Sequence, residues 1–560
     1  MSLRNRLILP ALLLLLAALA ACGGGSSTNP PVNPPPNGSF SNSNLNGNYV
    51  FSVTGTAASN DFVNIMGVFT ADGKGNITSG ILDQNSTAQG GLILETITSG
   101  TYDVGADGRA IGSSALPAGL ITLQTQKSGS FQFAYVLTSS AHGLLTEFES
   151  FGSASGTLDL QASVTQAQIS GQSYVFNLTG SSGIGGDLCG ISTGGSATPF
   201  ATVGAFTLDA NGQVVSGVED FNNNCLSSGS TNIAMTGGDI DLSTLPGTAR
   251  LTTGSGTSAI TYNFEVYPLD ATHLKFIEVD TQPMLVGDLF TQSSSFPTGN
   301  NIFTIAGFDV PGGVPFTAAG IFHFDSTGNI LSDSFEDIND GGTVAQFGAA
   351  AGGAAITGIS TPLTGGRTEI TFTSGFVNGN SLNACSSNCI FAAYPSTGGL
   401  QLLEIDDGGS TNGIAYSQSA TTLASGVGYG MNLTGATSSS SEDDVAQFTN
   451  NNGVFNGIID INDQGTTSFR NAFSGNYSAD PTIAGRGGVL QTKNAPLLTT
   501  YVIDGSTAVA VSADPGFVGL GALVTQNASA RSNVVANHLS LLRMSPVAHA
   551  RKKSSLPRSR

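Results

Sequence analysis

Residues able to carry out catalysis are sparse and scattered in this sequence. The stretch from Gly190 to Gly194 reads GISTG, which has the G-x-S-x-G spacing of a serine nucleophile elbow. That elbow needs a strand, a sharp turn and a helix around the serine, and the neighbouring residues predict no such arrangement. Among the five histidines, His142 and His273 stand at similar places in two parts of the chain, without a paired acid and base in a recognisable spacing. We therefore expect no catalytic site and no enzymatic activity.

Aspartate-rich turns are the best candidates for cation binding. DINDGG begins at Asp337 and DINDQG begins at Asp460, so both bring carboxylate and amide oxygens together, as hard cations prefer. A calcium loop of the EF-hand type would carry an acidic residue at its twelfth place, where this chain has Gly348 and Asn471. Asp and Asn are also common in hairpin turns for backbone reasons. We favour turn formation and expect neither a metal site nor a cofactor.

Four of the five cysteines fall into two pairs, each within one part of the chain. Cys189 pairs by position with Cys225, and Cys385 with Cys389. Two disulfides inside their domains are the favoured interpretation in an oxidising compartment. The alternative for the C-x3-C pair is a metal or redox site, although no histidine lies near it in the sequence.

The fifth cysteine ends a segment with the features of a secretion signal. Arg4 and Arg6 precede an apolar stretch from Leu7 to Ala21, which Pro10 interrupts and which is too short for a comfortable membrane span. The segment ends in LAAC, with Cys22 as its last residue.

LAAC resembles the lipobox of bacterial lipoproteins. In that family the signal is cut before the cysteine, its thiol receives a diacylglyceryl group, and the new amine is acylated with a fatty acid such as palmitate. The resemblance covers residues 1–22 and implies that Cys22 is a membrane anchor. Gly23 follows, where some such lipoproteins carry an Asp that retains them in the inner membrane, so the resemblance implies the outer membrane. The alternative is an ordinary signal peptide cut near Ala21.

The rest of the chain is a tandem array of four similar units. GVFTADGKGNITSGILDQN from Gly67 returns as GAFTLDANGQVVSGVEDFNNN, GIFHFDSTGNILSDSFEDIND and AQFTNNNGVFNGIIDIND. Each version reads as a strand, a tight turn of Asp, Asn and Gly, and a second strand. Each unit ends on G-x-[LA]-x-x-Q, with its closing glutamine at Gln161, Gln292, Gln418 or Gln526. The domains are therefore a signal segment at 1–22, a Gly/Ser/Pro tether at 23–44, repeats at 45–161, 170–292, 297–418 and 426–526, and a basic tail at 527–560.

Each repeat is predicted to fold as an all-β domain. The first contains eight strand candidates, with apolar residues at every second place and short turns between them. This pattern favours an up-and-down antiparallel barrel of eight strands, and a β-sandwich is the alternative. In strand count and turn spacing the units resemble the calycin-type barrels of lipocalins and avidins, without their N-terminal Trp. They also resemble repeats of uncharacterised multi-repeat bacterial lipoproteins. Neither resemblance implies a ligand or an activity.

Acidic and basic residues recur at fixed places in the repeats. One set of carboxylates precedes the closing Gly by nine or seven residues: Glu147, Glu278, Glu404, Glu149, Asp280, Asp406 and Asp514. The alternating pattern predicts that they point away from the core. A basic residue recurs in mid-repeat at Arg109, Arg250, Arg367 and Arg486. We expect ion pairs between these two sets across the outer surface of each barrel.

Charge is distributed unevenly along the chain. All 38 acidic residues lie between the apolar segment and Gln526, together with nine of the 18 basic ones, so this body has a net charge of −29. We expect such a body to repel nucleic acid. Its charge is expected to serve solubility, and attraction of cations is the alternative. After Gln526 come seven basic residues and no acid. We expect a flexible tail with a short helix near Val534 to Met544, and the alternatives are contact with an acidic domain or with an anionic surface.

Two functional hypotheses follow from this organisation. In the first, the protein is a cell-envelope lipoprotein whose four domains form a structural stalk or adhesive array, with an envelope protein or polysaccharide as its partner. In the second, each barrel holds a small apolar or saccharide ligand, lined by aromatic residues such as Phe131, Phe133, Tyr135, Tyr262 and Phe264. A filled barrel core is the commoner use of such residues.

Overall fold

The fold was determined from a computed structural model of the chain. It describes residues 39–59, 61–87, 91–113, 116–182, 199–223, 230–256, 259–280, 283–309, 314–378, 389–406 and 408–529. These residues form an almost entirely antiparallel β structure, as the alternating patterns predicted. The short helices are η1 (Asn42–Asn44), α2 (Gln166–Ile169), η3 (Ala349–Ala351) and η4 (Thr364–Gly366).

Barrel 1 is closed and has the strand order β1-β10-β9-β8-β7-β4-β3-β2. All eight strands predicted for the first repeat are present. They are β1 (Asn46–Ala57), β2 (Phe62–Asp72), β3 (Asn76–Ser86), β4 (Gly91–Thr101), β7 (Ile121–Thr125), β8 (Ser130–Leu137), β9 (His142–Glu147) and β10 (Gly152–Leu160). The small strands β5 (Gly112–Ser113) and β6 (Leu116–Pro117) pair with each other outside the barrel sheet.

Barrel 2 is closed in simple up-and-down order from β11 to β18. Its strands are β11 (Ser173–Ser181), β12 (Pro199–Leu208), β13 (Val214–Asn222), β14 (Ser230–Asp241), β15 (Gly247–Thr253), β16 (Ile260–Asp270), β17 (His273–Glu278) and β18 (Met284–Thr291).

Barrel 3 is closed by the pairing of β20 with β21, and β22 extends its sheet beside β21. The strands are β19 (Gly299–Asp309), β20 (Pro315–Phe324), β21 (Ile330–Asp340), β22 (Thr343–Phe347), β23 (Ile356–Pro362), β24 (Thr368–Ser374), β25 (Cys389–Ser396), β26 (Gly399–Glu404) and β27 (Gly409–Ser417).

Barrel 4 is closed in sequence order. Its strands are β28 (Val427–Thr437), β29 (Ser441–Asn451), β30 (Val454–Asp463), β31 (Thr466–Ala479), β32 (Arg486–Lys493), β33 (Leu498–Val502), β34 (Thr507–Ser512) and β35 (Phe517–Thr525). The predicted barrel architecture is thus confirmed, and the sandwich alternative is wrong.

Glycine in the repeated G-x-[LA]-x-x-Q motif allows the first and last strands of a barrel to approach closely. A Cβ atom on Gly156 would lie 1.8 Å from the Ser52 carbonyl oxygen, and one on Gly287 would lie 2.1 Å from that of Asn177. Both distances are far below a van der Waals contact, so a side chain at these places would push the two strands apart.

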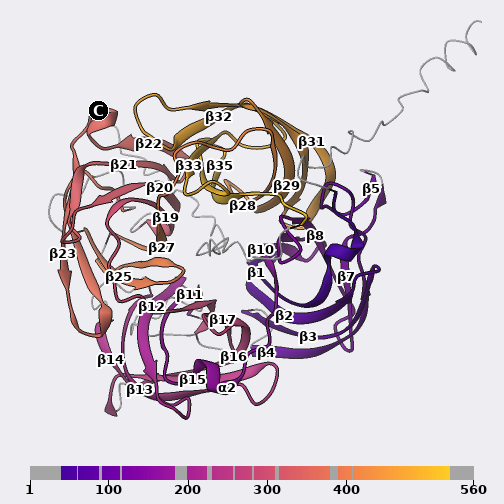
Figure 1. Cartoon of the computed structure of the whole chain (residues 1–560), viewed down its shortest axis with the longest axis horizontal. Coiled ribbons are helices and arrows are strands. Elements are labelled where there is room, and N and C mark those ends of the chain that lie inside the picture. The colour runs from indigo at the N-terminus through magenta and orange to yellow at the C-terminus, as the bar shows by residue number, and fades with distance from the viewer. Residues whose placement is uncertain are drawn as a thin grey trace, which may run out of the picture.

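The four barrels form a closed ring, with the first and last strands of each barrel toward its centre and the middle strands at its rim (Figure 1). Barrel 4 packs against barrel 1 through β28 and β29 on one side and β8, β9 and β10 on the other. An extended stalk, one form of the predicted array, is therefore wrong. The alternating pattern could not reveal this, because strand faces buried against a neighbouring barrel are as apolar as faces turned to a core.

Candidate functional site

The residues that recur in all four repeats meet at the contacts between successive barrels, which we call seams 1–2, 2–3, 3–4 and 4–1. Three apolar clusters mark the first three seams, and each contains residues of both adjoining barrels. At seam 4–1, Val445 and Phe469 of barrel 4 join the core cluster of barrel 1. The ring is thus held by apolar burial at every seam.

Seam 2–3 contains a fully buried ion pair with a tyrosine. Asp220, on β13 of barrel 2, accepts two hydrogen bonds from Arg367 of barrel 3, at 2.7 Å from Nε and 2.9 Å from Nη2. The hydroxyl of Tyr394 donates a third. Burial strongly raises the pKa of Tyr394, so its hydroxyl keeps its proton and acts as a donor. The bidentate geometry matches the guanidinium fork to the carboxylate.

Seam 3–4 repeats this arrangement one barrel further on. Asp337, on β21, accepts hydrogen bonds from Arg486 at 2.7 Å from Nε and 2.8 Å from Nη2, and another from the hydroxyl of Tyr501. Arg486 stands opposite Tyr501 in the strand register, and its guanidinium lies 5.3 Å from the centre of the Phe335 ring.

Seam 4–1 closes the ring with the arginine alone. Arg109 of barrel 1 pairs with Asp460 of barrel 4, and both side chains are fully buried. Val136 stands opposite Arg109, in the place that a tyrosine occupies at seam 3–4. A second arginine of barrel 4 supports the contact, since Arg470 donates from Nη1 to the Ala110 carbonyl oxygen at 2.9 Å.

Seam 1–2 has the tyrosine without the arginine. The Tyr267 hydroxyl of barrel 2 donates to Asp83 Oδ2, and Asp83 Oδ1 has no hydrogen-bond partner among the described residues. β15 begins at Gly247 opposite Val266, so Pro246 falls where the arginine stands in the other barrels. Burial raises the pKa of Asp83 to about 7, against a lowering by the Tyr267 hydrogen bond, and no cation among the described residues offsets the burial.

The predicted ion-pair partners of the arginines were therefore wrong. The prediction was that each arginine would bridge to carboxylates of its own barrel. Three of them instead reach the aspartate of the preceding barrel around the ring. Arg250 is not equivalent to the others, because it lies four residues after Pro246 and pairs with Asp239 at 3.5 Å with its side chain 59% exposed. Recurrence in mid-repeat thus groups arginines that occupy different positions in the strand register.

An asparagine two residues after each seam aspartate binds the main chain of the next barrel. Its side-chain amide donates to carbonyl oxygens of the turn before the last strand. These bonds run from Asn85 to Glu278 at 2.6 Å, from Asn222 to Glu404 and Gly409 at 3.0 Å, from Asn339 to Asp514 and Phe517 at 3.0 Å, and from Asn462 to Glu147 at 2.7 Å and Gly152 at 2.8 Å. The Asp-x-Asn pair is thus one recognition unit, used at all four seams.

The closing glutamine of each repeat also reaches into the following barrel. In each case the side-chain Nε2 donates to a main-chain carbonyl oxygen. These bonds run from Gln161 to Pro268 (2.8 Å), from Gln292 to Gly365 (2.9 Å), from Gln418 to Val502 (2.9 Å) and from Gln526 to Leu137 (2.8 Å). The fourth of these bonds joins barrel 4 to barrel 1. The motif that ends a repeat in the sequence therefore attaches it to the next barrel, including across the closure of the ring.

Sequence reasoning missed the role of this Asp-x-Asn pair, although the signal was present. DQN at Asp83, DFN at Asp220, DIN at Asp337 and DIN at Asp460 stand at the same place in all four repeats. From the sequence, only the pairs at Asp337 and Asp460 are assigned, to turns or, as an alternative, to calcium. Among the described residues, no group of three or more His, Cys, Asp or Glu is arranged to hold a metal ion.

Three of the carboxylates before the closing glycine, Glu147, Glu278 and Glu404, are buried, contrary to the prediction that they point outward. The four that lie seven residues before it are half-buried: Glu149, Asp280, Asp406 and Asp514. Glu147 stands opposite Phe133, Glu278 opposite Phe264 and Glu404 opposite Phe391, and all three aromatic residues belong to barrel cores. Burial is the main cause that raises the pKa of Glu147 to about 9, and it raises that of Glu278 and Glu404 well above the ordinary value.

The orientation of these carboxylates was predicted wrongly for the same reason that the ring was not predicted. Thr146, on the opposite face of the strand from Glu147, is fully buried as well. Because both faces of such a strand are covered, alternation in the sequence could not identify the face turned to the core.

The aromatic residues predicted to line a ligand site lie within barrel cores. Phe131, Phe133 and Tyr135 belong to the core cluster of barrel 1, and Tyr262 and Phe264 to that of barrel 2. Phe133 and Phe51 have ring centres 5.7 Å apart, and Phe264 and Phe276 have theirs 5.0 Å apart. Phe133 thus packs on a ring of β1, and Phe264 packs on a ring of the adjacent strand β17.

The histidines of barrels 1 and 2 are paired with acids on neighbouring strands. His142 Nδ1 lies 2.7 Å from Asp159 Oδ1, and His273 Nε2 lies 2.6 Å from Asp288 Oδ1. Lys275 also donates to Asp288 at 2.9 Å.

Several predicted features fall outside the described residues. They include the signal segment with Cys22, residues 23–38 of the tether, the GISTG stretch, Cys189, Cys225, Cys385, and residues 530–560 of the basic tail with the short helix expected there. Cys389, the first residue of β25, is buried and disulfide-bonded, and the two predicted pairings remain predictions. None of the described helices is long and apolar enough to cross a membrane.

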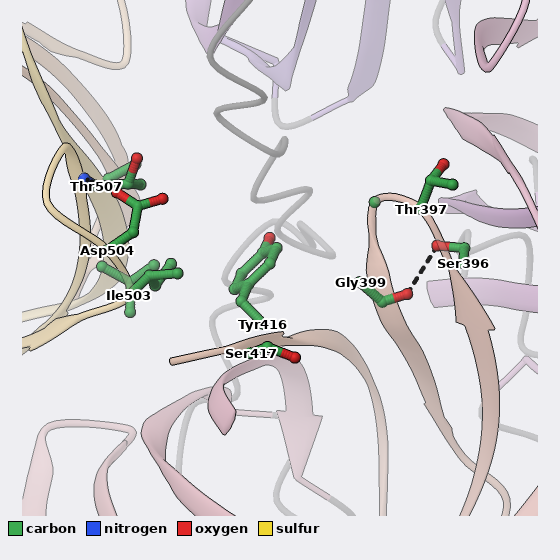
Figure 2. Close-up of a pocket in the computed structure, with 11 residues that line it drawn as sticks. Ser396, Thr397, Gly399, Tyr416, Ser417, Ile503, Asp504 and Thr507 are labelled. Carbon is green, nitrogen blue, oxygen red and sulfur yellow. Dashed lines mark hydrogen bonds between the residues drawn. The ribbon is translucent and has the colours of Figure 1, made fainter. Parts of the chain in front are cut away.

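Two pockets lie at boundaries between barrels. One, of about 270 Å³, is bounded in barrel 3 by the β25–β26 turn and in barrel 4 by residues 503–507. Tyr416 stands between these two walls, and Ser396 donates to the Gly399 carbonyl oxygen at 2.7 Å (Figure 2). The other, of about 480 Å³, adjoins Gln292 and Arg367 at seam 2–3.

Comparisons with known proteins found little. No family model matches the chain, and no curated protein is detectably similar in sequence. Among solved structures, the chain is similar to a double mutant of the vaccine antigen Transferrin Binding Protein B from Haemophilus parasuis Hp5, at 10% identity and a TM-score of 0.16, over 70% of this chain and 85% of that one. A similarity this low carries no argument about fold or function, so the functional interpretation is based on the chain's own residues.

Proposed function

We propose that this chain is a lipid-anchored protein of the bacterial cell envelope, in the outer membrane, with a structural or interaction role and no enzymatic activity. Its ring of four barrels is one body that presents rim strands and turns to an envelope protein or polysaccharide. The N-terminal lipobox supports the anchor, and the repeated residues support the structural role.

The observation that carries this proposal is the use of the repeated residues. A repeated catalytic or ligand site would place reactive residues at the same position of each unit. Here the seam aspartates, the asparagines after them and the closing glutamines are engaged between barrels instead. The polar residues that the four repeats share therefore serve to assemble the ring.

Lipid attachment can be tested by mass spectrometry of the N-terminal peptide. The full chain, expressed in a Gram-negative host, is expected to begin at an acylated Cys22 and to fractionate with the outer membrane. Cys22→Ser, the matched control, is expected to remain unprocessed or to lose its lipid. A mature chain that begins near Cys22 with a free thiol would contradict the anchor.

The interaction role can be tested by photo-crosslinking from exposed turns. Asn211 and Asn452 lie in exposed turns that are equivalent in barrels 2 and 4. A photoreactive residue at either position is expected to yield a discrete adduct with an envelope component in intact cells. The same substitution at Val203, buried in seam 2–3, is the control and is expected to yield only internal products. Identical products from both kinds of position would contradict the proposed role.

A second candidate function is binding of a small polar ligand such as a saccharide. The pocket around Tyr416 favours it, because hydroxyl groups of Ser396, Ser417 and Thr507 surround an aromatic ring there. Native and denaturing mass spectra of the mature protein from its own host would test this. An extra native mass that vanishes on denaturation, and is absent from Tyr416→Ala, would support it. A bare polypeptide mass in both proteins would exclude a retained ligand.

A further inference from the structure

A second group of buried polar side chains lies inside barrel 2, on the inner face of its sheet rather than at a seam. It consists of Glu219 on β13, Thr253 on β15, Tyr262 on β16 and Glu278 on β17. Tyr262 belongs to the apolar core of barrel 2, and each of the other three stands two residues from a core member on its own strand. Since alternate residues of a strand share a face, all four side chains point into the barrel. Each residue is at most 2% exposed.

Each of the two glutamates is held by a hydrogen bond at one oxygen. Glu219 Oε1 accepts from the Thr202 hydroxyl at 2.5 Å, and Glu278 Oε1 accepts from the Asn263 amide at 2.9 Å. In both glutamates the other oxygen, Oε2, has no hydrogen-bond partner among the described residues. The bonds at Oε1 therefore orient the two carboxyl groups and leave both Oε2 atoms able to bind something else.

Two hydroxyl groups face the same part of the barrel interior. Burial raises the pKa of Glu219 to about 7, and the hydroxyls of Thr202, Thr253 and Tyr262 lower it. Burial also raises the pKa of Glu278, and the charge of Glu219 adds to that rise. These mutual influences place the groups near one another, yet the Thr253 and Tyr262 hydroxyls have no partner at hydrogen-bond geometry among the described residues. Four oxygen atoms with unused binding capacity thus converge from four strands.

The recurring core glutamate is satisfied differently in the other barrels that contain it. Glu147 in barrel 1 and Glu404 in barrel 3 stand at the place of Glu278, nine residues before the closing glycine. Both accept hydrogen bonds from protein donors at each of their two oxygens. The donors are the Glu149 amide and Asn462 for Glu147, and Asn378 and Thr411 for Glu404. Among these three glutamates, Glu278 is therefore the one that retains an oxygen without a partner in the described part of the chain.

The donor set inside barrel 2 has the chemistry of a site for a hard cation. Buried polar atoms without a partner destabilise a fold, and buried carboxylates are ordinarily paired or bound to a metal ion. Carboxylate and hydroxyl oxygens suit Ca²⁺ or Mg²⁺, whereas zinc and copper favour the nitrogen and sulfur ligands that this group lacks. Two ionised carboxylates would also balance the charge of one divalent ion.

We propose that the interior of barrel 2 binds one Ca²⁺ ion, with Glu219 and Glu278 as carboxylate ligands and Tyr262 and Thr253 as hydroxyl ligands. The site is separate from the aspartate-rich turns that the sequence suggested for calcium, and it belongs to one barrel rather than to every repeat. Its role is to stabilise barrel 2, and it does not depend on lipid attachment at Cys22.

The test uses the full chain carrying Cys22→Ala, freed of metal with a chelator and titrated with CaCl₂ in a calorimeter. We expect one Ca²⁺ per chain and a rise in Tm of about 2–4 °C at saturating Ca²⁺. Glu219→Gln and Glu278→Gln, which keep the size of the side chain, are each expected to weaken Ca²⁺ binding at least about tenfold. Glu404→Gln, the matched change in barrel 3, is expected to leave the affinity for Ca²⁺ unchanged.

Terbium luminescence gives a second readout that does not depend on removing a carboxylate. The chain has no Trp, so Tb³⁺ bound in barrel 2 is excited through Tyr262. Emission that Ca²⁺ displaces, and that Tyr262→Phe largely removes, would support the site. No Ca²⁺ binding by the parent protein would overturn the proposal and leave water as the partner of these oxygens. Binding that is equal in the parent, Glu219→Gln and Glu278→Gln would overturn it as well, because it would assign the ion to acids on the surface.

Discussion

Seams 2–3 and 1–2 are built on the same aspartate and differ in what meets it. At seam 2–3, Asp220 has Arg367 and Tyr394 as partners. At seam 1–2, Tyr267 is the partner of Asp83 among the described residues, because Pro246 stands where the arginine would be. The difference shows that a repeated residue can keep its place while its charge state changes. Asp220 faces a fixed cation, whereas burial raises the pKa of Asp83 to about 7.

The largest expected effect comes from removing the arginine of seam 2–3. Arg367→Ala leaves Asp220 buried without its cation, which should lower the free energy of unfolding by about 3–5 kcal/mol. Arg250→Ala, at the sequence-similar but exposed position of barrel 2, should change it by less than about 0.5 kcal/mol. Urea unfolding of both variants measures this, and equal effects would show that the two arginines are equivalent after all.

Asp83 should make seam 1–2 sensitive to pH. Its pKa is raised from 3.8 to about 7 by burial, so the folded ring holds a proton in a range where the unfolded chain has lost it. The stability that this group contributes is therefore present at low pH and is lost as pH rises from about 4 to about 7, by at most about 4 kcal/mol. Asp83→Asn should match the parent protein near pH 4 and exceed its stability at pH 8.

Thermal unfolding of parent and Asp83→Asn across this range isolates the effect. Other buried acids, such as Glu219 with a pKa of about 7, make the parent's stability fall in the same direction. The difference between the two proteins is therefore the informative quantity. A difference that does not vary with pH would mean that Asp83 stays charged in the seam.

Loss of the seam asparagine should have an intermediate effect. Asn222→Ala leaves the carbonyl oxygens of Glu404 and Gly409 without their donor at a buried contact, which should cost about 1–3 kcal/mol. Asn211→Ala, in an exposed turn of the same barrel, is the control and should have almost no effect. If urea unfolding cannot distinguish the two variants, the seam asparagine has no structural role.

The smallest expected effects come from removing the tyrosine hydroxyl at each of the two seams. Tyr394→Phe leaves Asp220 paired with Arg367, so it should cost about 0.5–1 kcal/mol. Tyr267→Phe removes the hydrogen bond at Asp83 where no arginine remains, and should cost about 1.5–2 kcal/mol at low pH. A reversed order in thermal unfolding would indicate that the tyrosine matters most beside the cation.

Much of the fold could be predicted from sequence, because it depends on local patterns. Alternating residues such as Tyr49, Phe51 and Val53 identified β1, and all eight strands of barrel 1 were found in this way. The ring could not be predicted, because it depends on strand faces that are apolar for another reason. Val203 and Val218 contact a neighbouring barrel rather than their own core, and alternation does not distinguish these two kinds of burial.

The recurrence of the seam residues could be recognised in the sequence, but their role could not. Asp83 and Asn85 recur in every repeat, yet their partners lie in a different barrel, such as Tyr267, 184 residues away. Arg250 shows the opposite failure, since it recurs in mid-repeat like the other arginines while its strand register differs from theirs. The residue before it is Ala249, whereas Gly precedes each of the other three. Recurrence indicates that a residue matters to each unit, and only the arrangement of the units shows why.

Closure of the ring fixes the copy number of the repeat. Each seam joins two different surfaces, and such a head-to-tail contact ends without a free surface only when the rotation per unit closes a circle, here after four units. A chain with three or five units would leave one apolar seam face and its Asp-x-Asn pair exposed, and would be driven to associate with a second chain. Gain or loss of a single repeat is therefore disfavoured, even though each repeat has a core of its own.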